Sequence, residues 1–172
     1  MANIFESDFV LEPSAGIGGL AVFAKAWGAT VAVNELSDRR FTVLSSMGFD
    51  HVFRENAEHI DDVLPDEISP SVVIMNPPFS STAGRTKNNK TSNAEKHIDS
   101  ALARLRQGGR LVAILGKGMT MRIIKNTGIS SAKTIASEQT FPSMVKTIRN
   151  MAQHTVFSLL LSIKRERRQV KL

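Results

Sequence analysis

The stretch from Val10 to Gly19 constrains the fold of this chain more than any other part of its 172 residues. An apolar run ends at Leu11 and leads through Glu12 and Pro13 into a turn with three glycines at positions 16, 18 and 19. Glycine lets the main chain approach a ligand closely, and a helix that follows such a turn offers free N–H groups. We therefore expect a strand, a ligand-binding glycine loop and a helix here.

Apolar runs and amphipathic stretches alternate along the rest of the chain. Strands are expected at 9–11, 30–33, 51–54, 71–75, 111–115, 133–136 and 156–163. Helices are expected at 20–27, after Ser37, behind the capping box Ser92-x-x-Glu95, and more weakly at 120–126 and 144–151. This order predicts an α/β fold of one domain, 1–172, with a doubly wound and mostly parallel sheet of seven-stranded type.

Helical spacing also predicts which side chains face the core. The expected inward residues are Leu20, Phe23, Ala24 and Trp27 in the first helix, Phe41, Leu44 and Met47 in the second, and Ile98, Ala101, Leu102 and Leu105 in the helix behind residue 92. Glycines at 28, 48 and 108 are expected to end these three helices.

Composition excludes several classes of protein. The chain has no cysteine, so disulfides and zinc-thiolate sites are ruled out, and its four histidines lack metal-ligand spacing, so we expect no metal. No window approaches the roughly 18 apolar residues of a membrane span, and a basic-then-apolar signal sequence is missing. We expect a cytoplasmic protein without a membrane partner.

A net charge of +6 favours a polyanionic partner such as nucleic acid. Arg85, Lys87 and Lys90 lie in a polar loop at 80–92 that we expect to be mobile without a ligand. A second group of basic residues crowds a C-terminal tail at 164–172, for which a solvated tail and a nucleic-acid contact are equally good readings.

The sharpest chemical signal is the run Asn76-Pro77-Pro78-Phe79, which follows an apolar strand. Proline holds the preceding residue extended, so Pro77 and Pro78 fix the direction of the Asn76 side chain and of nearby carbonyls. Two acceptors aimed at one NH₂ group can draw its lone pair out of conjugation with a ring, and Phe79 offers a face on which a base stacks. The alternative is a structural Pro-Pro turn with a core phenylalanine.

Two further polar positions follow expected strand ends. Glu35 suits the two hydroxyls of a ribose, unless it is simply a solvated carboxylate at a strand end. Asn56, with Ala57, can accept from an adenine amino group, although an Asx turn is equally compatible with the local sequence. Because ligands of parallel sheets bind at the carboxyl ends of the strands, we expect Glu12, Glu35, Asn56 and Asn76 on one rim.

These motifs resemble the class I S-adenosylmethionine-dependent methyltransferases, and in particular the γ-type DNA N6-adenine methyltransferases. Residues 11–18 look like the first motif of that family, and Asn76 to Phe79 look like its catalytic motif. The resemblance covers residues 9–115 well and the remainder loosely. It implies a Rossmann-like methyltransferase fold with S-adenosyl-L-methionine as the cofactor.

By this resemblance, methyl transfer to adenine N6 in DNA follows flipping of the base out of the duplex. The implied catalytic residues are Asn76, Pro77, Pro78 and Phe79, and the implied cofactor-binding residues are Glu12, Pro13, Ser14, Ala15, Gly16, Gly18, Glu35, Leu36, Asn56 and Ala57. Arg85, Lys87 and Lys90 would hold phosphates, and Phe141 would contact the target base.

The chain also departs from the family. About eight residues precede the first strand, and a target-recognition domain and clear later motifs are missing after Gly116. This leaves open a protein partner or larger assembly that completes the cofactor site. Two alternatives follow: an adenine-N6 or guanine-N2 methyltransferase of ribosomal or transfer RNA, and a catalytically silent subunit of the same fold that binds nucleic acid or a partner.

Overall fold

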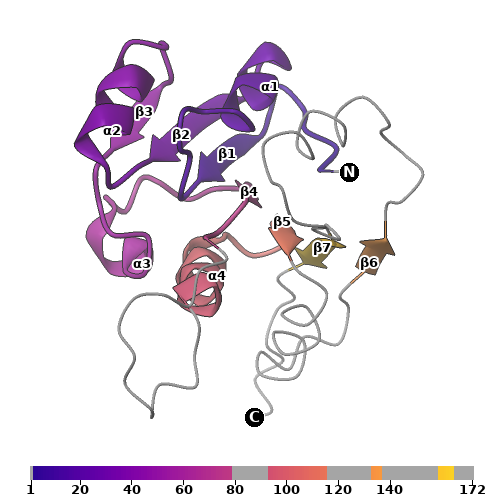
Figure 1. Ribbon diagram of the computed structural model, residues 1–172. Coiled ribbons are helices and arrows are strands. Elements are labelled where there is room, and N and C mark those ends of the chain that lie inside the picture. The colour runs from indigo at the N-terminus through magenta and orange to yellow at the C-terminus, as the bar shows by residue number, and fades with distance from the viewer. Residues whose placement is uncertain (1, 79–92, 116–132, 137–158, 165–172) are drawn as a thin grey trace, which may run out of the picture.

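Seven strands form one sheet in the order β3-β2-β1-β4-β5-β7-β6 (Figure 1). The computed structural model describes residues 2–78 and 93–115 in full, and the backbone of 133–136 and 159–164. The strands are β1 (Phe9–Glu12), β2 (Thr30–Asn34), β3 (His51–Phe53), β4 (Val72–Met75), β5 (Arg110–Leu115), β6 (Lys133–Ala136) and β7 (Leu159–Lys164). The first five pair in parallel, while β7 runs antiparallel to both β5 and β6. The doubly wound, mostly parallel α/β sheet is confirmed.

The described helices cover both faces of the parallel strands (Figure 1). They are α1 (Ala21–Ala26), α2 (Asp38–Ser45), α3 (Ile60–Val63) and α4 (Asn93–Arg104). Buried residues of α1 and α2 share one core cluster with the sheet, and those of α3 and α4 share a second cluster on the other face. This two-sided burial explains why the strands read as continuous apolar runs.

Strand β1 lies between β2 and β4, in the interior of the sheet. Leu11 pairs in register with Ala32 of β2 and Val73 of β4, and all three side chains are completely buried. An apolar strand gains most stability at such a position, because each fully buried valine or leucine side chain contributes roughly 1.5–3 kcal/mol relative to exposure. The glycine loop therefore starts from the middle of the sheet.

The expected inward face of the first helix is wrong at its two aromatic residues. Phe23 is 58% exposed and Trp27, just after the helix, is 71% exposed, whereas Ala21 and Ala24 are buried. Small side chains let this six-residue helix pack closely on β1 and β2, and that packing rotates the larger residues outward. In the second helix Leu44 is buried as expected, but Met47 is 37% exposed and is also a correction.

Helix α3 was not anticipated, because four residues are too few to show a helical period. The strand at 133–136 is confirmed, and the last strand is seen at Leu159–Lys164. The expected helices at 120–126 and 144–151, the loop at 80–92 and the tail beyond residue 164 lie outside the described residues. Ser92 of the predicted capping box is also outside them.

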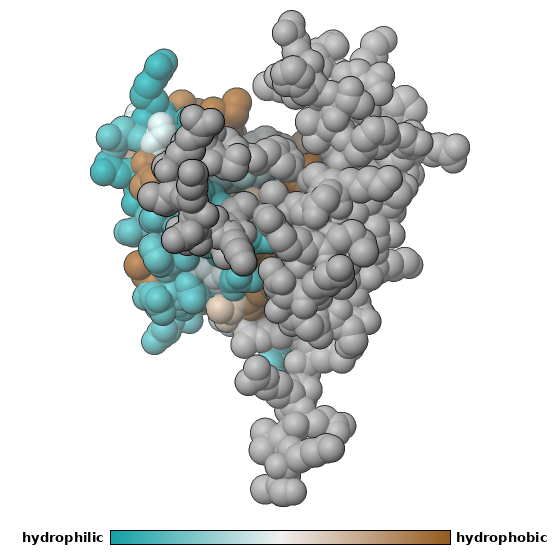
Figure 2. Space-filling view, turned by 60° about the horizontal axis from the view of Figure 1, so that its bottom comes forward, coloured by the Kyte–Doolittle hydropathy of each residue, from teal (hydrophilic) through white to brown (hydrophobic). Residues whose placement is uncertain are grey.

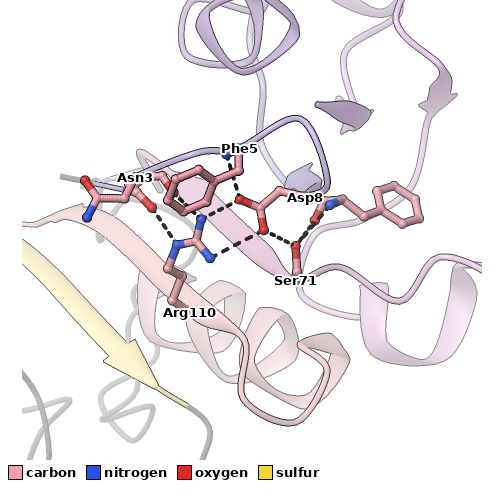
Figure 3. A network of polar contacts seen from close by, with 7 residues as sticks. Asn3, Phe5, Asp8, Ser71 and Arg110 are labelled. Atoms are coloured by element: carbon pink, nitrogen blue, oxygen red, sulfur yellow. Dashed lines mark hydrogen bonds and ion pairs between the residues drawn. The ribbon is translucent and has the colours of Figure 1, made fainter. Parts of the chain in front are cut away.

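A polar network joins the amino-terminal ends of three parallel strands (Figure 3). The Asp8 carboxylate accepts hydrogen bonds from Arg110 Nη2 at 2.6 Å, Ser71 Oγ at 2.7 Å and the Phe5 N–H at 2.9 Å. Arg110 also donates to the Asn3 carbonyl at 2.5 Å. Because this network sits at the edge opposite the polar carboxyl ends, it is a structural element of the sheet.

On the face that Figure 2 shows, the visible described residues are mainly hydrophilic, with separate hydrophobic areas among them. The exposed hydrophobic side chains include Ile17, Val22, Phe23 and Trp27 around α1. Among the helices that the structure describes, none is long and apolar enough to cross a membrane.

Candidate active site

The carboxyl ends of four neighbouring strands carry the candidate residues to one edge of the sheet. Glu12 is the last residue of β1, Glu35 follows β2, Asn56 comes three residues after β3, and Asn76 follows β4. The parallel pairing of these strands in the order β3-β2-β1-β4 places their ends side by side. The expected convergence on one rim is therefore confirmed as an arrangement of the backbone.

Asn34 fastens the loop after β1 to the loop after β3. Its side-chain amide donates to the carbonyls of Pro13 and Glu55, both at 2.9 Å, and its side-chain oxygen accepts from the Glu55 N–H at 2.8 Å. Its own carbonyl accepts from the Ala15 N–H at 2.9 Å. We did not single out Asn34 from the sequence, although a polar residue that ends an apolar strand was the available signal.

Gly16 and Gly18, two of the three glycines of the loop, have different surroundings. Both adopt positive φ angles, +60° for Gly16 and +81° for Gly18. A Cβ atom on Gly18 would lie 3.1 Å from Leu44 Cδ2 and Phe49 Cζ, so Gly18 permits close packing of the protein, and its expected approach to a ligand stays a prediction. A Cβ atom on Gly16 would have no atom of the described residues within 4 Å, so these residues leave the loop open to a ligand there.

Glu12 is a buried acid at the end of β1, with 2% of its surface exposed. Its Oε2 accepts a hydrogen bond of 2.8 Å from the N–H of Ala21, the first residue of α1. Burial raises the pKa of Glu12 to about 8, and the backbone hydrogen bond opposes this shift only partly. The side chain thus ties the strand to the helix and carries its proton at neutral pH.

Glu35 is held at the end of β2 by three donors. Its Oε1 accepts from the Ser37 N–H at 2.8 Å and from Arg40 Nη2 at 2.7 Å, while its Oε2 accepts from the Gly16 N–H at 2.9 Å. Burial raises the pKa of Glu35, but the bonds from Arg40 and the backbone outweigh burial and bring it below its ordinary value. The reading of Glu35 as a solvated carboxylate is wrong, because the residue is 6% exposed.

Ser37 occupies the N-cap position of α2 as expected, yet its side chain makes no capping hydrogen bond. The Glu35 carboxylate instead accepts from the N–H of Ser37 itself, just before the first helical residue. A negative charge at this end of a helix also suits the helix dipole. Glu35 therefore connects the glycine loop to the start of α2.

Helix α4 reaches the same loop through a histidine. The Ser14 hydroxyl and His97 Nδ1 are 3.1 Å apart, and burial is the largest cause that lowers the pKa of His97. His97 is half-buried. Next to it, Lys96 donates to Glu58 at 2.9 Å. Because Ser14 and His97 are 83 positions apart in the chain, the local sequence could not predict this contact.

The remaining candidates next to the glycine loop differ in exposure. Asn56 Oδ1 accepts from the Glu58 N–H at 3.1 Å, which is an Asx turn, while the Asn56 side chain stays exposed. Ala57 is buried in the core cluster of α3 and α4, and Leu36 is 59% exposed at the rim. Asn56 and Leu36 are thus the accessible members of this group.

The Asn76-Pro77-Pro78 segment leaves β4 at the same rim. Asn76 and Pro78 are exposed, while Pro77 is buried and anchors the segment. The other predicted residues, Phe79, Arg85, Lys87, Lys90 and Phe141, lie outside the described residues. Within the described ranges no group of three or more His, Cys, Asp or Glu side chains is arranged to hold a metal ion.

Comparisons with known proteins bear on the fold. No protein-family model and no curated protein matches the sequence. Among solved structures, an rRNA methylase from Streptococcus thermophilus matches with a TM-score of 0.62 at 14% identity, over 95% of this chain and 90% of that one.

Two longer proteins are also similar. The 16S rRNA N2 G1207 methyltransferase of T. thermophilus, in complex with AdoMet and guanosine, has a TM-score of 0.64 at 17% identity over 96% of this chain and 39% of its own. A Listeria monocytogenes protein described as a putative class I S-adenosylmethionine-dependent methyltransferase has a TM-score of 0.66 at 13% identity. The match covers 95% of this chain and 55% of the Listeria protein. The chain therefore has the Rossmann-like fold of the class I methyltransferases.

Proposed function

We propose that this chain transfers a methyl group from S-adenosyl-L-methionine to the N6 amino group of adenine in DNA, with the base flipped out of the duplex. The observation that carries the proposal is the position of Asn76, exposed at the end of β4 and on the same rim as the open glycine loop after β1. This order of a nucleoside-binding loop and an Asn-Pro-Pro-Phe segment on adjacent strands suits a cofactor and a planar amine lying next to each other.

The residues at the rim fit the proposed cofactor. The open space at Gly16 admits a ligand against the main chain, and the Glu35 carboxylate beside it is a natural acceptor for ribose hydroxyls. Glu12, Pro13, Ser14 and Ala15 complete the loop in this proposal, and Leu36, Asn56 and Ala57 border the adenine. The bound cofactor supplies an electrophilic methyl group on sulfonium sulfur.

Asn76 acts on the amine of the target. Its side-chain oxygen and a carbonyl of the Pro77-Pro78 segment accept from the NH₂ group, which draws the nitrogen towards tetrahedral geometry and its lone pair out of conjugation with the ring. Pro77 is buried and rigid, so the two acceptors keep their directions while the base enters. Phe79 stacks on the base, and Arg85, Lys87, Lys90 and Phe141 contact the nucleic acid around it.

RNA is the second candidate substrate. Two of the similar structures are named as rRNA methylases, and one of them is complexed with guanosine. An adenine-N6 or guanine-N2 amine of ribosomal RNA presents the same kind of group to Asn76. A protein partner that completes the cofactor site is compatible with either substrate.

Methyl transfer from labelled S-adenosylmethionine to matched DNA and RNA duplexes and single strands tests the proposal. We expect labelled N6-methyladenine in DNA. Labelled RNA with unlabelled DNA would select the second candidate. Cofactor binding without transfer to any of these substrates would favour a catalytically silent subunit of this fold.

Asn76→Ala should lower the transfer rate by about a hundredfold or more, because a lost electrostatic contact to the reacting group costs roughly 10²–10³ in rate. The side chain is exposed, so the unfolding temperature and cofactor affinity should stay close to those of the unaltered chain. Single-turnover transfer and calorimetry separate the two effects. Turnover by Asn76→Ala at the unaltered rate would rule out this mechanism.

A further inference from the structure

Glu35 accepts three hydrogen bonds in this structure, which leaves too few free acceptor sites for both hydroxyls of a ribose. A carboxylate offers about four lone-pair sites, two on each oxygen. The Ser37 N–H and Arg40 fill both sites on Oε1, and the Gly16 N–H fills one site on Oε2. A ribose diol that bridges the two oxygens needs one site on each, so one donor must leave Oε1.

Arg40 is the donor that can leave. The Ser37 N–H belongs to the backbone at the N-cap of α2, and the Gly16 N–H belongs to the glycine loop. Neither can withdraw without moving an element of the fold. The Arg40 side chain is 52% exposed, whereas the Glu35 side chain is 7% exposed, so the guanidinium can turn into solvent at little cost.

We propose that Arg40 competes with the cofactor's ribose for Glu35, so that it limits the affinity of this chain for S-adenosylmethionine and its product. The inference rests on the proposed function. Ligand binding exchanges the 2.7 Å contact between Arg40 and Glu35 for a ribose hydroxyl. The free energy of the lost ion pair is subtracted from the binding free energy of the cofactor.

The effect is moderate because Arg40 is half exposed. Partly exposed ion pairs contribute little to about 1 kcal/mol, so removal of Arg40 should tighten ligand binding by about two- to fivefold. The alternative role for Arg40 is to orient Glu35 for the ligand. That role predicts weaker binding when Arg40 is removed, so the two roles differ in the sign of the change.

The experiment is titration calorimetry of the full chain with S-adenosylhomocysteine, which lacks the sulfonium charge. Arg40→Ala should bind more tightly than the unaltered chain, and Arg40→Lys, which keeps a cation, should lie between them. Arg39→Ala is the matched control, since Arg39 is an exposed residue of the same helix and forms no ion pair with another described residue. We expect no change for this control.

A second measurement excludes a general effect on the fold. Without ligand, Arg40→Ala should unfold at the same or a slightly lower temperature, so its tighter ligand binding would not come from a more stable fold. Added salt should tighten binding to the unaltered chain more than to Arg40→Ala, because salt screens the ion pair that the ligand must displace.

The outcomes separate this inference from the proposed function. Binding that depends on Glu35 but is unchanged or weakened in Arg40→Ala overturns the competition by Arg40 and leaves the cofactor site in place. Absence of binding in every variant, Arg40→Ala included, overturns the proposed cofactor and this inference with it.

Discussion

At the scale of single residues, Gly16 and Gly18 of the same loop have different structural roles. Gly18 lies against Leu44 and Phe49, where a methyl group would be 3.1 Å from each side chain. Gly16 lies beside the Glu35 carboxylate, to which its N–H donates, and the described residues leave the space next to its Cα open. The first glycine position is thus free for a ligand and the second is needed for packing.

Alanine at these positions should separate stability from ligand binding. Both substitutions place a side chain at positive φ, which costs about 1–2 kcal/mol of unfolding free energy. Gly18→Ala should cost about 1–3 kcal/mol more because it also overpacks the core. Urea unfolding measures this difference.

Gly16→Ala, by contrast, should weaken binding of S-adenosylhomocysteine beyond its small cost in stability, because the added methyl group occupies the open space. Gly18→Ala serves as the control for backbone strain. Equal unfolding free energies for the two variants would show that Gly18 is not needed for packing against α2.

At the scale of elements, the Asp8 network locks the amino-terminal ends of the central strands (Figure 3). Asp8 precedes β1, Ser71 precedes β4, and Arg110 begins β5. Burial raises the pKa of Asp8, but hydrogen bonds from Arg110, Ser71 and the Phe5 N–H outweigh burial, so the pKa lies below its ordinary value. This edge holds the strands in register and leaves the opposite edge for a ligand.

Asp8→Ala should therefore lower the free energy of unfolding by about 2–4 kcal/mol, because it leaves Arg110 without its carboxylate partner in a largely buried place. Asp38→Ala is the matched control, since Asp38 pairs with Arg54 while its side chain is 77% exposed. Its removal should cost less than about 1 kcal/mol. Chemical denaturation of both variants checks the contrast, and equal losses would contradict the role of the network.

At the scale of the whole molecule, groups with shifted pKa values act in opposite directions on stability. Asp8, Glu35 and Asp50 have lowered pKa values, so their contribution is present above the ordinary values of 3.8 for Asp and 4.5 for Glu and is lost as the pH falls. The lowered pKa of His97 likewise costs stability as the pH falls below 6.5. Glu12 acts the other way, because its raised pKa favours the protonated form in the folded chain.

These opposite effects predict a pH range in which Glu12 makes the largest contribution to the pH dependence of the unfolding free energy. Between 6.5, the ordinary pKa of histidine, and about 8, the free energy of unfolding should fall as the pH rises, because folding keeps a proton on Glu12 that the unfolded chain releases. Glu12→Gln, which mimics the protonated acid, should remove this slope. Thermal unfolding at a series of pH values measures it, and an unchanged slope in Glu12→Gln would contradict a proton on Glu12.

Local sequence was sufficient for the parallel core of the sheet and for the positions of the rim residues. Apolar runs of strand length at 9–11, 30–33 and 71–75 predicted buried strands. Glu12 and Asn76 follow such runs directly, and Glu35 comes two residues after the run at 30–33. In a parallel sheet each strand end points to the same edge, so position along the chain determines which edge a residue reaches. The glycine loop was visible for the same reason.

Tertiary packing determines which partners the residues at the rim contact. Only the folded chain brings Arg40 onto Glu35, His97 onto Ser14 and Asn34 between two loops, because these contacts depend on how helices and loops lie across the sheet. The same packing buries the alanines of α1 against the sheet and leaves Trp27 exposed. The local sequence pattern therefore determines the strands and the rim, whereas contacts that form only in the folded chain determine the charge, the hydrogen bonding and the openness of the site.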